Sequence, residues 1–336
     1  MEEDLEIICN GLEKDRLTFE DRDVLITGGA GFLGSWICDV LMRQGAKGTC
    51  IDNLVSGQRG NISHLEGNEA FKFIDHDISQ PITLDESFDL VMHLASRASP
   101  FEFAEHPIQI LKANTLGIWV ALGIAKKNNA RFVYTSTSEV YGDPDPRFIP
   151  TPETYNGNVN PVGPRSSYDE AKRAGEAFVT AYHQEHGMDT RMVRTFNTYG
   201  PRMRADDIYG RVVPRFVEQA LSNDPITVFG DGSQTRSFTY VTDQIEGILR
   251  LALADNASGE VVNIGNDKEV SILKLANMVK GITGSSSEIE FLPLPEDDPK
   301  RRCPDISKAK ELLNWEPKVD LEEGLGRFID YVKKSL

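Results

Sequence analysis

The sequence predicts an α/β protein: a doubly wound parallel sheet followed by a smaller C-terminal α/β domain that would bind substrate. Apolar runs alternate with segments of helical length, as is typical of a parallel sheet with helices on both faces. The runs are at 23–27, 47–51, 70–74, 88–94, 131–136 and 190–196. From about residue 197 the chain changes to shorter elements and loops rich in Pro, Gly and Arg. We divide it into an arm at 1–20, a nucleotide-binding domain at 21–196 and a substrate domain at 197–336, with some segments interleaved.

The composition is that of a globular enzyme with an acidic surface. The chain has 336 residues, 40% of them hydrophobic, and a net charge of −16. That charge disfavours nucleic acid and acidic membranes as partners, and an anionic substrate must be met by a local arginine cluster. No apolar stretch approaches the ~18 residues of a membrane span, and the acidic start of the chain is unlike a signal peptide. We therefore expect a cytoplasmic protein without a membrane partner.

Cysteine and histidine usage argues against a metal site. The four cysteines are far apart and form no Cys-x-x-Cys pair; they are Cys9, Cys38, Cys50 and Cys303. We interpret them as reduced thiols in a cytoplasmic protein. The six histidines have no metal-ligand spacing. We expect no bound metal.

The first predicted strand leads directly into clustered glycines, at Gly28, Gly29, Gly31 and Gly34. An apolar stretch with helical spacing begins at Phe32, so the segment is predicted to be a strand, a tight turn and a helix. Glycine lets the backbone approach a pyrophosphate, and the N-terminus of the helix attracts the anion. This predicts a Rossmann-type dinucleotide site. The alternative is a glycine-rich turn without a ligand.

The second predicted strand ends at Asp52, about 20 residues after the glycines. A carboxylate there can accept hydrogen bonds from an adenosine ribose diol and would repel a 2′-phosphate. The first basic residue after it is Arg59, so NAD is favoured over NADP. The alternative for Asp52 is a capping or turn residue. Asp77, after the third apolar run, is either an adenine contact or a surface loop acid.

The fifth run, at 131–136, continues into Thr137, Ser138 and Glu139. Ligands of doubly wound sheets bind at the carboxyl ends of the strands, so these side chains should share a crevice with the nucleotide. A hydroxyl at Thr137 can hydrogen-bond a substrate hydroxyl, and Glu139 can act as a general acid or base. The alternative for Glu139 is a solvated loop acid.

Tyr168 and Lys172 are four residues apart in a predicted helix near 166–186, so their side chains lie on one face. A nearby ammonium favours the phenolate and lowers the pKa of the tyrosine from about 10. Such a tyrosine can take a proton from a sugar hydroxyl near neutral pH. The spacing is common by chance, and the upstream glycine motif is what favours a catalytic pair. Other helices are predicted near 107–127 and at 321–332.

These motifs resemble the extended short-chain dehydrogenase/reductase family of nucleotide-sugar enzymes, over residues 22–336. Within it, three stretches are most similar to the UDP-glucuronate decarboxylases. The first is 155–165 leading into 168–173; the second is 194–203 with 210–213 and 232–238; the third is 297–299 with 301–306 and 315–317. Arg97 departs from the pattern, because the decarboxylases usually have proline there, near the expected sugar pocket. The arm at 1–20 also lies outside the family pattern.

The resemblance implies that a tightly held NAD oxidises UDP-glucuronate at C4, that the C6 carboxylate leaves as carbon dioxide, and that the ketone is reduced again to UDP-xylose. Tyr168, activated by Lys172 and supported by Thr137, would take the C4 hydroxyl proton, and Glu139 would manage protons at C5.

The resemblance also implies two sets of binding residues. The cofactor contacts would be Gly28, Gly31, Phe32, Leu33, Gly34, Asp52, Asn53, Asp77, Ile78, Leu94, Ala95, Ser96, Tyr168, Lys172 and Arg202. The substrate contacts would be Lys112, Arg165, Asn197, Arg211, Val213, Arg236 and Arg302. The alternative for any one of the basic residues is a surface ion pair.

Other functions on the same fold stay open. A 4-epimerase would use the same tyrosine, lysine and NAD but reduce the ketone from the opposite face. A 4,6-dehydratase generally has an aspartate where this chain has Ser138. A non-catalytic nucleotide-binding protein is a reading of a different class. The two helices near 107–127 and 166–186 predict a homodimer joined by a four-helix interface, as in many relatives.

Overall fold

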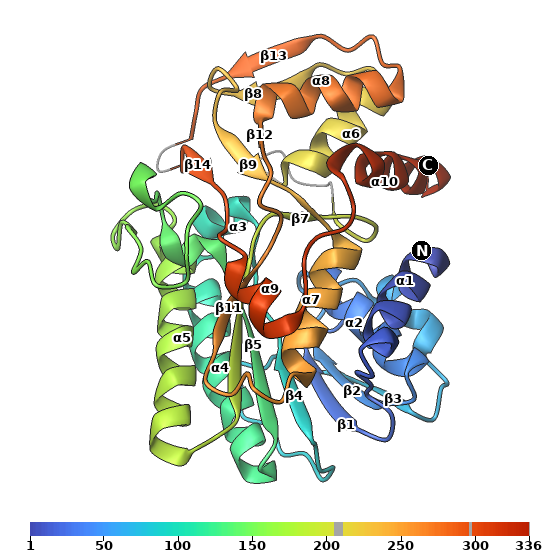
Figure 1. Ribbon diagram of the computed structural model, residues 1–336, viewed down its shortest axis with the longest axis vertical. Coiled ribbons are helices and arrows are strands. Elements are labelled where there is room, and N and C mark those ends of the chain that lie inside the picture. The colour runs from blue at the N-terminus through green and yellow to red at the C-terminus, as the bar shows by residue number, and fades with distance from the viewer. Residues whose placement is uncertain (205–210, 296–297, 336) are drawn as a thin grey trace.

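A seven-stranded parallel sheet forms the larger lobe of the computed structural model, which describes residues 1–204, 211–295 and 298–335 (Figure 1). The strand order is β11-β6-β5-β4-β1-β2-β3, and all neighbouring strands are parallel. The strands are β1 (Asp23–Thr27), β2 (Lys47–Asp52), β3 (Phe71–Asp75), β4 (Leu90–His93), β5 (Arg131–Thr137), β6 (Thr190–Thr195) and β11 (Val261–Ile264). The sheet class and the six predicted strands are confirmed, with ends that differ by at most two residues.

Helices cover both faces of the sheet, which is why its strands are apolar on both sides. α4 (Pro107–Asn128) and α5 (Ser166–His186) lie on one face. α2 (Phe32–Arg43) and α7 (Val241–Leu253) lie on the other, and every residue of α7 is buried. Figure 1 shows this three-layer arrangement, with the smaller lobe above the sheet.

The edge of the sheet beside β6 is completed by a strand from far along the chain. β11 pairs with β6 in the register Val261↔Met192 to Ile264↔Thr195. α9 (Ser307–Leu313) packs beside β11. Segments numbered after residue 196 therefore contribute to the nucleotide-binding lobe, so the chain crosses between the lobes more than once.

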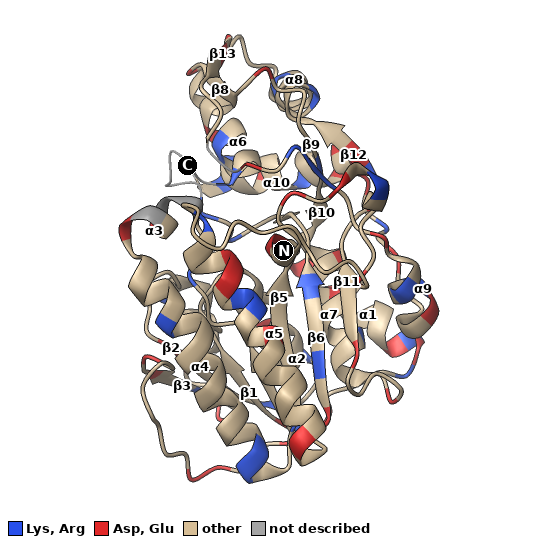
Figure 2. Ribbon diagram, turned by 90° about the vertical axis from the view of Figure 1, so that its left-hand side faces the viewer, with Lys and Arg blue, Asp and Glu red and all other residues tan. Residues whose placement is uncertain are grey.

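The smaller lobe sits above the carboxyl ends of the strands (Figures 1 and 2). Its helices are α6 (Val212–Ser222), α8 (Ile272–Thr283) and α10 (Leu321–Ser335), and α3 (Pro100–Glu105) is a short helix beside α4. Its strands form small sheets: β8 (Ile226–Phe229) with β13 (Ile289–Leu292), and β9 (Thr235–Ser237) with β12 (Glu269–Ser271) and β14 (Arg301–Arg302). β7 (Thr198–Tyr199) pairs with β10 (Thr239–Tyr240) near the junction of the lobes. Gly210 and Asp297, which belong to the stretches similar to the decarboxylases, lie outside the described residues.

The N-terminal arm is largely a helix, α1 (Glu2–Lys14), that packs on α2 and α7. Its apolar side chains Leu5, Ile8 and Leu12 are buried. The buried guanidinium of Arg250, on α7, reaches Asp15 at 2.6 Å and the carbonyl oxygen of Gly11 at 2.8 Å. The arm is thus an integral part of the core of the larger lobe.

The helix α5, which carries Tyr168 and Lys172, approaches the sheet very closely at Gly175. A Cβ atom there would lie 2.3 Å from the hydroxyl oxygen of Tyr134 on β5. Only glycine fits such an approach, so this position sets how near α5 lies to the strand that ends at Thr137.

The helix α4 corrects one expectation from the sequence. By length and composition it is apolar enough to cross a membrane, so the prediction that no stretch reaches that size is wrong. The reason is that α4 packs against α5 and β4 and also exposes apolar side chains: Ile108, Leu111, Leu116 and Trp119. Core helices of soluble proteins can have the same length and composition. What distinguishes α4 is its row of exposed apolar side chains, because such patches mark interaction surfaces.

Candidate active site

The glycine loop after β1 has the shape of an anion cradle. Gly28 has a φ of +77°, and a Cβ at Gly34 would lie 2.1 Å from the carbonyl oxygen of Gly28. Gly31 precedes α2 as its N-cap and provides no side-chain cap for the first turn. The backbone N–H groups that begin this helix are therefore available to a phosphate. Phe32 and Leu33 form the first turn of α2.

Asp52 lies at the end of β2, directly beside this loop. Its carboxylate accepts hydrogen bonds from the backbone N–H of Ala30 at 3.0 Å and of Leu54 at 2.9 Å. Burial raises its pKa. A carboxylate has about four acceptor positions, so Asp52 keeps capacity for a ribose diol. The side chains of Asn53 and Asp77 each cap a turn two residues on, at Val55 and Ser79.

The loop after β4 packs against the glycine loop. A Cβ at Gly28 would lie 2.7 Å from the Cα of Ala95, so the segment Leu94–Ser96 forms the opposite wall of the cradle. The hydroxyl oxygen of Ser96 is buried and has no hydrogen-bond partner. One guanidinium nitrogen of Arg202 is buried without a partner as well, while another lies 2.8 Å from Asp39 of α2. Ile78 is buried next to α4. These orphaned polar atoms and the open cradle fit a dinucleotide.

Tyr168, Thr137 and Lys172 converge at the carboxyl end of β5. The side chains of Thr137 and Tyr168 are hydrogen-bonded to each other. The ammonium of Lys172 donates to the carbonyl oxygen of Thr135 at 2.9 Å and lies 5.9 Å from the centre of the Tyr168 ring. Both side chains are buried. The predicted spacing on one helix face is therefore realised in three dimensions.

The predicted effect of Lys172 on Tyr168 needs correction for the free protein. Burial, followed by the charge of Glu139, raises the pKa of Tyr168, while the hydrogen bond from Thr137 lowers it. Burial lowers the pKa of Lys172 to about 7. The physical reason is that both groups lie in a site of low polarity, where desolvation of the charged forms outweighs their mutual attraction.

Glu139 is held by two arginines rather than exposed to solvent. Arg302 donates two hydrogen bonds to it, Nη1 to Oε1 at 2.5 Å and Nη2 to Oε2 at 2.7 Å, and Arg165 pairs with Oε2. Burial alone would raise the pKa of Glu139, but Arg165 and Arg302 outweigh it and lower the pKa to about 2. Arg236 lies nearby and pairs with Asp298 at 2.9 Å.

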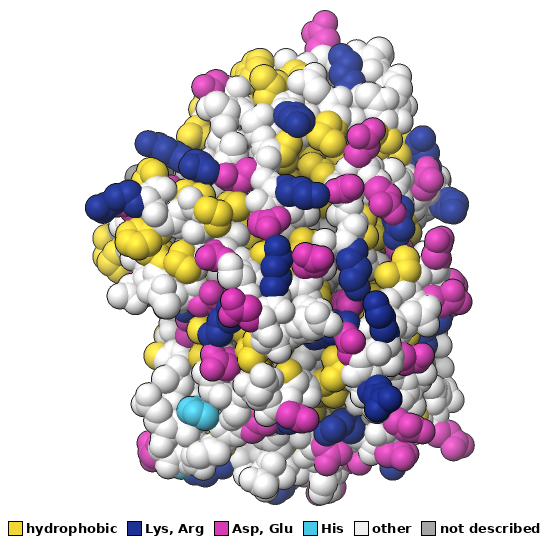
Figure 3. All heavy atoms as spheres, viewed as in Figure 1, with side chains coloured by type: hydrophobic (Ala, Val, Ile, Leu, Met, Phe, Trp, Pro, Cys, Tyr) yellow, Lys and Arg dark blue, Asp and Glu magenta, His cyan; other side chains and the backbone are white. Residues whose placement is uncertain are grey.

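The arginine cluster that we expected for binding an anionic substrate is present, and it lies around Glu139. Figure 3 shows acidic and basic side chains interspersed over the face it displays, without a broad basic patch. The buried guanidinium groups of Arg236 and Arg302 and the half-buried one of Arg165 are instead gathered around Glu139. The sequence predicted these residues separately and did not predict that they would meet.

Three residues at the site were not among those that we predicted from the sequence. Phe103 of α3 stacks on Tyr168, with ring centres 4.7 Å apart and planes 13° apart. His93, at the end of β4, accepts or donates a 2.8 Å hydrogen bond with Thr27, and burial lowers its pKa to about 3, so it is neutral. Asp169 is a second buried acid, 3.7 Å from Arg165, and burial raises its pKa to about 7. Of these, His93 lies in the apolar run at 88–94 and Asp169 lies in the stretch at 168–173, while Phe103 lies in none of the patterns.

Arg97, the departure from the family pattern, pairs with Glu102. Its Nη2 lies 2.7 Å from Oε1 of that residue, which is adjacent to Phe103 on α3. The ion pair therefore ties the loop after β4 to the helix that covers Tyr168. A proline would restrict this loop by its own ring, and here an ion pair restrains it.

The other predicted substrate residues lie apart from this cluster or at its border. Arg211 is the N-cap of α6, and its charge lowers the pKa of Tyr168, which places it near the phenol. Val213 is buried in the first turn of α6. The backbone carbonyl of Asn197 accepts from Thr239. Lys112 is exposed on α4.

Comparisons with known proteins agree with this geometry. The sequence model of the NAD dependent epimerase/dehydratase family matches residues 24–265. The chain is 47% identical over 324 residues to UDP-glucuronic acid decarboxylase 1 of Xenopus tropicalis, covering 96% of this chain and 74% of that protein. It is 49% identical over 306 residues to UDP-glucuronic acid decarboxylase 1 of Arabidopsis thaliana, covering 91% and 68%.

Solved structures with the same fold include two 4-epimerases. UDP-glucose 4-epimerase of Thermotoga maritima, solved with UDP-glucose, has a TM-score of 0.84 and 33% identity, covering 93% of this chain and 99% of that one. UDP-glucuronic acid 4-epimerase of Bacillus cereus, solved with UDP-glucuronic acid and NAD, has a TM-score of 0.82 and 33% identity, covering 94% and 100%.

Proposed function

This chain belongs to the NAD-dependent epimerase/dehydratase family, and we propose that it converts UDP-glucuronate to UDP-xylose and carbon dioxide. The observation that carries this choice is the 47–49% identity to UDP-glucuronic acid decarboxylases over more than nine-tenths of the chain. The solved 4-epimerases are 33% identical over a similar length. The gathering of Arg165 and Arg302 on Glu139 next to Tyr168 suits a substrate with a sugar carboxylate.

NAD fits the cradle at the carboxyl ends of β1, β2 and β4. The N–H groups that begin α2 would hold its pyrophosphate, and Asp52 its adenosine ribose. The orphaned atoms of Ser96 and Arg202 lie on segments predicted to contact it. When bound, NAD would supply the acceptor for the C4 hydride of the sugar and the donor for the later reduction of the ketone.

Tyr168 is the proposed base for the C4 hydroxyl. Its phenol, hydrogen-bonded to Thr137, takes that proton in the forward step and gives it back in the last step. Because burial raises its pKa, positive charge on the protein is needed to favour the phenolate. Arg211 supplies part of it, and the ammonium of Lys172 lies 5.9 Å from the ring.

We propose that Glu139 delivers the proton to C5 once Arg165 and Arg302 also bind the substrate. With a pKa near 2 in the free protein, it is ionised and has no proton to give. The diphosphate and carboxylate of the substrate compete for the same guanidinium groups. When Arg302 turns to the substrate, the pKa of Glu139 rises toward its ordinary value, and the side chain can take a proton from solvent water and pass it to C5 after carbon dioxide has left. With C4 a ketone, the C6 carboxylate leaves as carbon dioxide, its bonding electrons passing toward the C4 oxygen.

The experiment that tests this function is incubation of the purified protein and NAD with UDP-glucuronate, followed by mass and proton NMR analysis. The expected product is UDP-xylose, lighter than the substrate by one carbon dioxide. Absence of reaction would overturn the proposal and direct the search to UDP-glucose and UDP-galactose.

A second candidate is a 4-epimerase of UDP-glucuronate. The observation in its favour is the TM-score of 0.82 to the Bacillus cereus enzyme that was solved with that sugar nucleotide and NAD. In the same incubation, a product of unchanged mass with inverted C4 would identify this activity.

We also propose that the protein is a cytoplasmic homodimer without nucleic-acid or membrane partners. The exposed apolar residues of α4 face away from its own core, at Ile108, Leu111, Leu116 and Trp119. Figure 2, which turns α4 and α5 toward the viewer, shows mostly uncharged positions along both helices. A second copy would bury this row in a four-helix interface.

Trp119→Glu is expected to convert the dimer into a monomer, because a charge at the centre of an apolar interface is costly to bury. Light scattering at micromolar concentration should give twice the chain mass of 37.4 kDa for the parent protein and the single mass for the variant.

The matched control is Phe291→Glu, on β13 of the smaller lobe. The exposed fraction of Phe291 is 54%, close to the 51% of Trp119. This variant should stay dimeric. A monomeric parent protein would refute the dimer.

A further inference from the structure

Asn263, at the end of β11, is buried and uses all the hydrogen-bonding groups of its side chain. Its amide oxygen accepts from the hydroxyl of Tyr141 at 2.7 Å. Its amide nitrogen donates to the carbonyl oxygens of Thr151 at 2.9 Å and Asp305 at 3.1 Å. These partners lie 122, 112 and 42 residues from Asn263, so the side chain joins β11 to three distant stretches of chain.

Two of those segments hold the backbone next to Arg302. The N–H of Thr151 donates to the carbonyl of Cys303 at 2.8 Å, and the N–H of Asp305 donates to Thr151 at 3.0 Å. Cys303 directly follows Arg302, whose guanidinium holds Glu139. The position of Arg302 therefore depends on the two backbone hydrogen bonds between Thr151 and the 303–305 segment. Asn263 adds one hydrogen bond to each of these two stretches of chain.

The third segment holds Glu139. Tyr141 belongs to the same 3-10 turn, Ser138–Tyr141, so its ring fixes the turn that presents the carboxylate. Its hydroxyl accepts from Arg194 at 2.9 Å. Arg194 in turn makes two hydrogen bonds to Glu176, at 2.8 and 2.7 Å.

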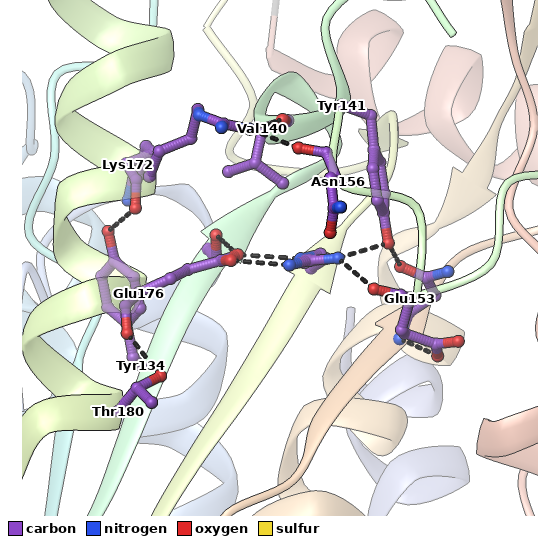
Figure 4. Close-up of polar contacts among 12 residues, drawn as sticks. Tyr134, Val140, Tyr141, Glu153, Asn156, Lys172, Glu176 and Thr180 are labelled. Carbon is purple, nitrogen blue, oxygen red and sulfur yellow. Dashed lines mark hydrogen bonds and ion pairs between the residues drawn. The ribbon is translucent and has the colours of Figure 1, made fainter. Parts of the chain in front are cut away.

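The same network reaches the catalytic helix. Glu176 is one turn after Lys172 on α5, and it accepts from the hydroxyl of Ser136 at 2.6 Å, one residue before Thr137. Figure 4 shows Glu176 on one side and Tyr141 and Glu153 on the other side of a single guanidinium group. The turn that carries Glu139 and the segment that carries Arg302 are thus both hydrogen-bonded to one residue. Asn263 bonds Tyr141 on the Glu139 side and Thr151 and Asp305 on the Arg302 side.

We propose that Asn263 is a positioning residue that sets Arg302 against Glu139 and so serves the carboxylate chemistry at C5 and C6; this rests on the proposed function. Without its amide, the carbonyl of Asp305 loses its donor, the hydroxyl of Tyr141 loses its acceptor, and the carbonyl of Thr151 keeps only the N–H of Asp305. The 303–305 segment then moves to find other partners. Tyr168, Thr137 and Lys172 keep their own contacts, so oxidation at C4 continues. The step that slows is therefore decarboxylation.

The test uses Asn263→Ala in the holoenzyme with UDP-glucuronate. We expect the rate of carbon dioxide release to fall about tenfold or more, with the KM changed less than the kcat, because a misplaced catalytic group costs on the order of that factor. Absorbance at 340 nm should rise to a higher steady level than in the parent, since oxidised sugar waits for a slow step. Asn263→Ser, whose hydroxyl can donate to one of the two carbonyls, should recover part of the rate.

A second readout is independent of turnover. In the Asn263→Ala protein, amide hydrogen exchange at Asp305 should be about tenfold faster than in the parent, because its support has been removed. The matched control is Asn128→Ala at the end of α4, whose amide also bridges two segments, through Phe88 and Ile124. That variant should show neither the 340 nm signal nor faster exchange at Asp305.

Uniform slowing of all steps without accumulation of reduced cofactor, or unchanged exchange at Asp305, would overturn the inference. If Asn263→Ala does not fold, Tyr141→Phe removes one hydroxyl from the same network, and an unchanged 340 nm level in that variant overturns it equally. If the parent protein releases no carbon dioxide from UDP-glucuronate, the proposed function fails, and hydrogen exchange alone decides whether Asn263 holds the 303–305 segment.

Discussion

Tyr168→Phe is expected to lower the rate of UDP-xylose formation by on the order of 10³-fold, because it removes the proposed base while leaving the ring in place. The phenylalanine keeps the stacking on Phe103 at 4.7 Å, and the cofactor cradle at the glycine loop is untouched. Calorimetry should therefore give dissociation constants for NAD and UDP close to those of the parent protein. Product formation is followed by proton NMR.

The control for this variant is Tyr182→Phe, the same chemical change farther along α5, where the tyrosine ring contacts His186 and not the site. It should retain full activity. Near-normal turnover by Tyr168→Phe would remove Tyr168 from the mechanism, and equal loss in both variants would point to a defect of the helix rather than of a base.

Lys172→Met is expected to lower activity by roughly 10²- to 10⁴-fold and at the same time to change how stability depends on pH. Burial holds the pKa of Lys172 near 7, against 10.5 for an ordinary lysine. Between these values the unfolded chain binds a proton that the folded protein has released. Stability from this group therefore rises with pH through that window, at about 1.4 kcal/mol for each pH unit. Methionine has no such proton, so the variant loses this slope.

The measurement is the free energy of unfolding by urea, for parent and variant without nucleotide, at pH 7, 8 and 9. The advantage of the methionine variant should be largest at pH 7 and should shrink as pH rises, although the loss of the 2.9 Å hydrogen bond to Thr135 offsets part of it. The control is the exposed Lys274→Met, whose difference from the parent should be small and independent of pH. A Lys172→Met difference that stays constant with pH would mean that Lys172 titrates normally in the folded protein.

Local patterns accounted for most of the larger lobe and for part of the site. The alternation of apolar runs predicted the parallel sheet, because the period of side-chain direction is set by backbone geometry within each element. The spacing of Tyr168 and Lys172 placed them on one face of α5 for the same reason. The glycines at 28 and 34 predicted a close backbone turn, which the structure has. The similarity of three longer stretches to UDP-glucuronate decarboxylases agrees with the relatives found by comparison.

What the sequence by itself determined is thus the strands β1 to β6, the helices α2, α4 and α5, the glycine motif, the spacing of Tyr168 and Lys172 and the family. Only the tertiary structure decided that Arg302 holds Glu139 across 163 residues of chain, that Phe103 covers Tyr168 and that the side chain of Asn263 bonds three segments of chain. It also reversed the predicted shift in the pKa of Tyr168. The physical reason is common to all of these: contacts between distant segments, and the burial that governs a pKa, depend on which surfaces pack together, and the spacing of residues along the chain does not carry that information.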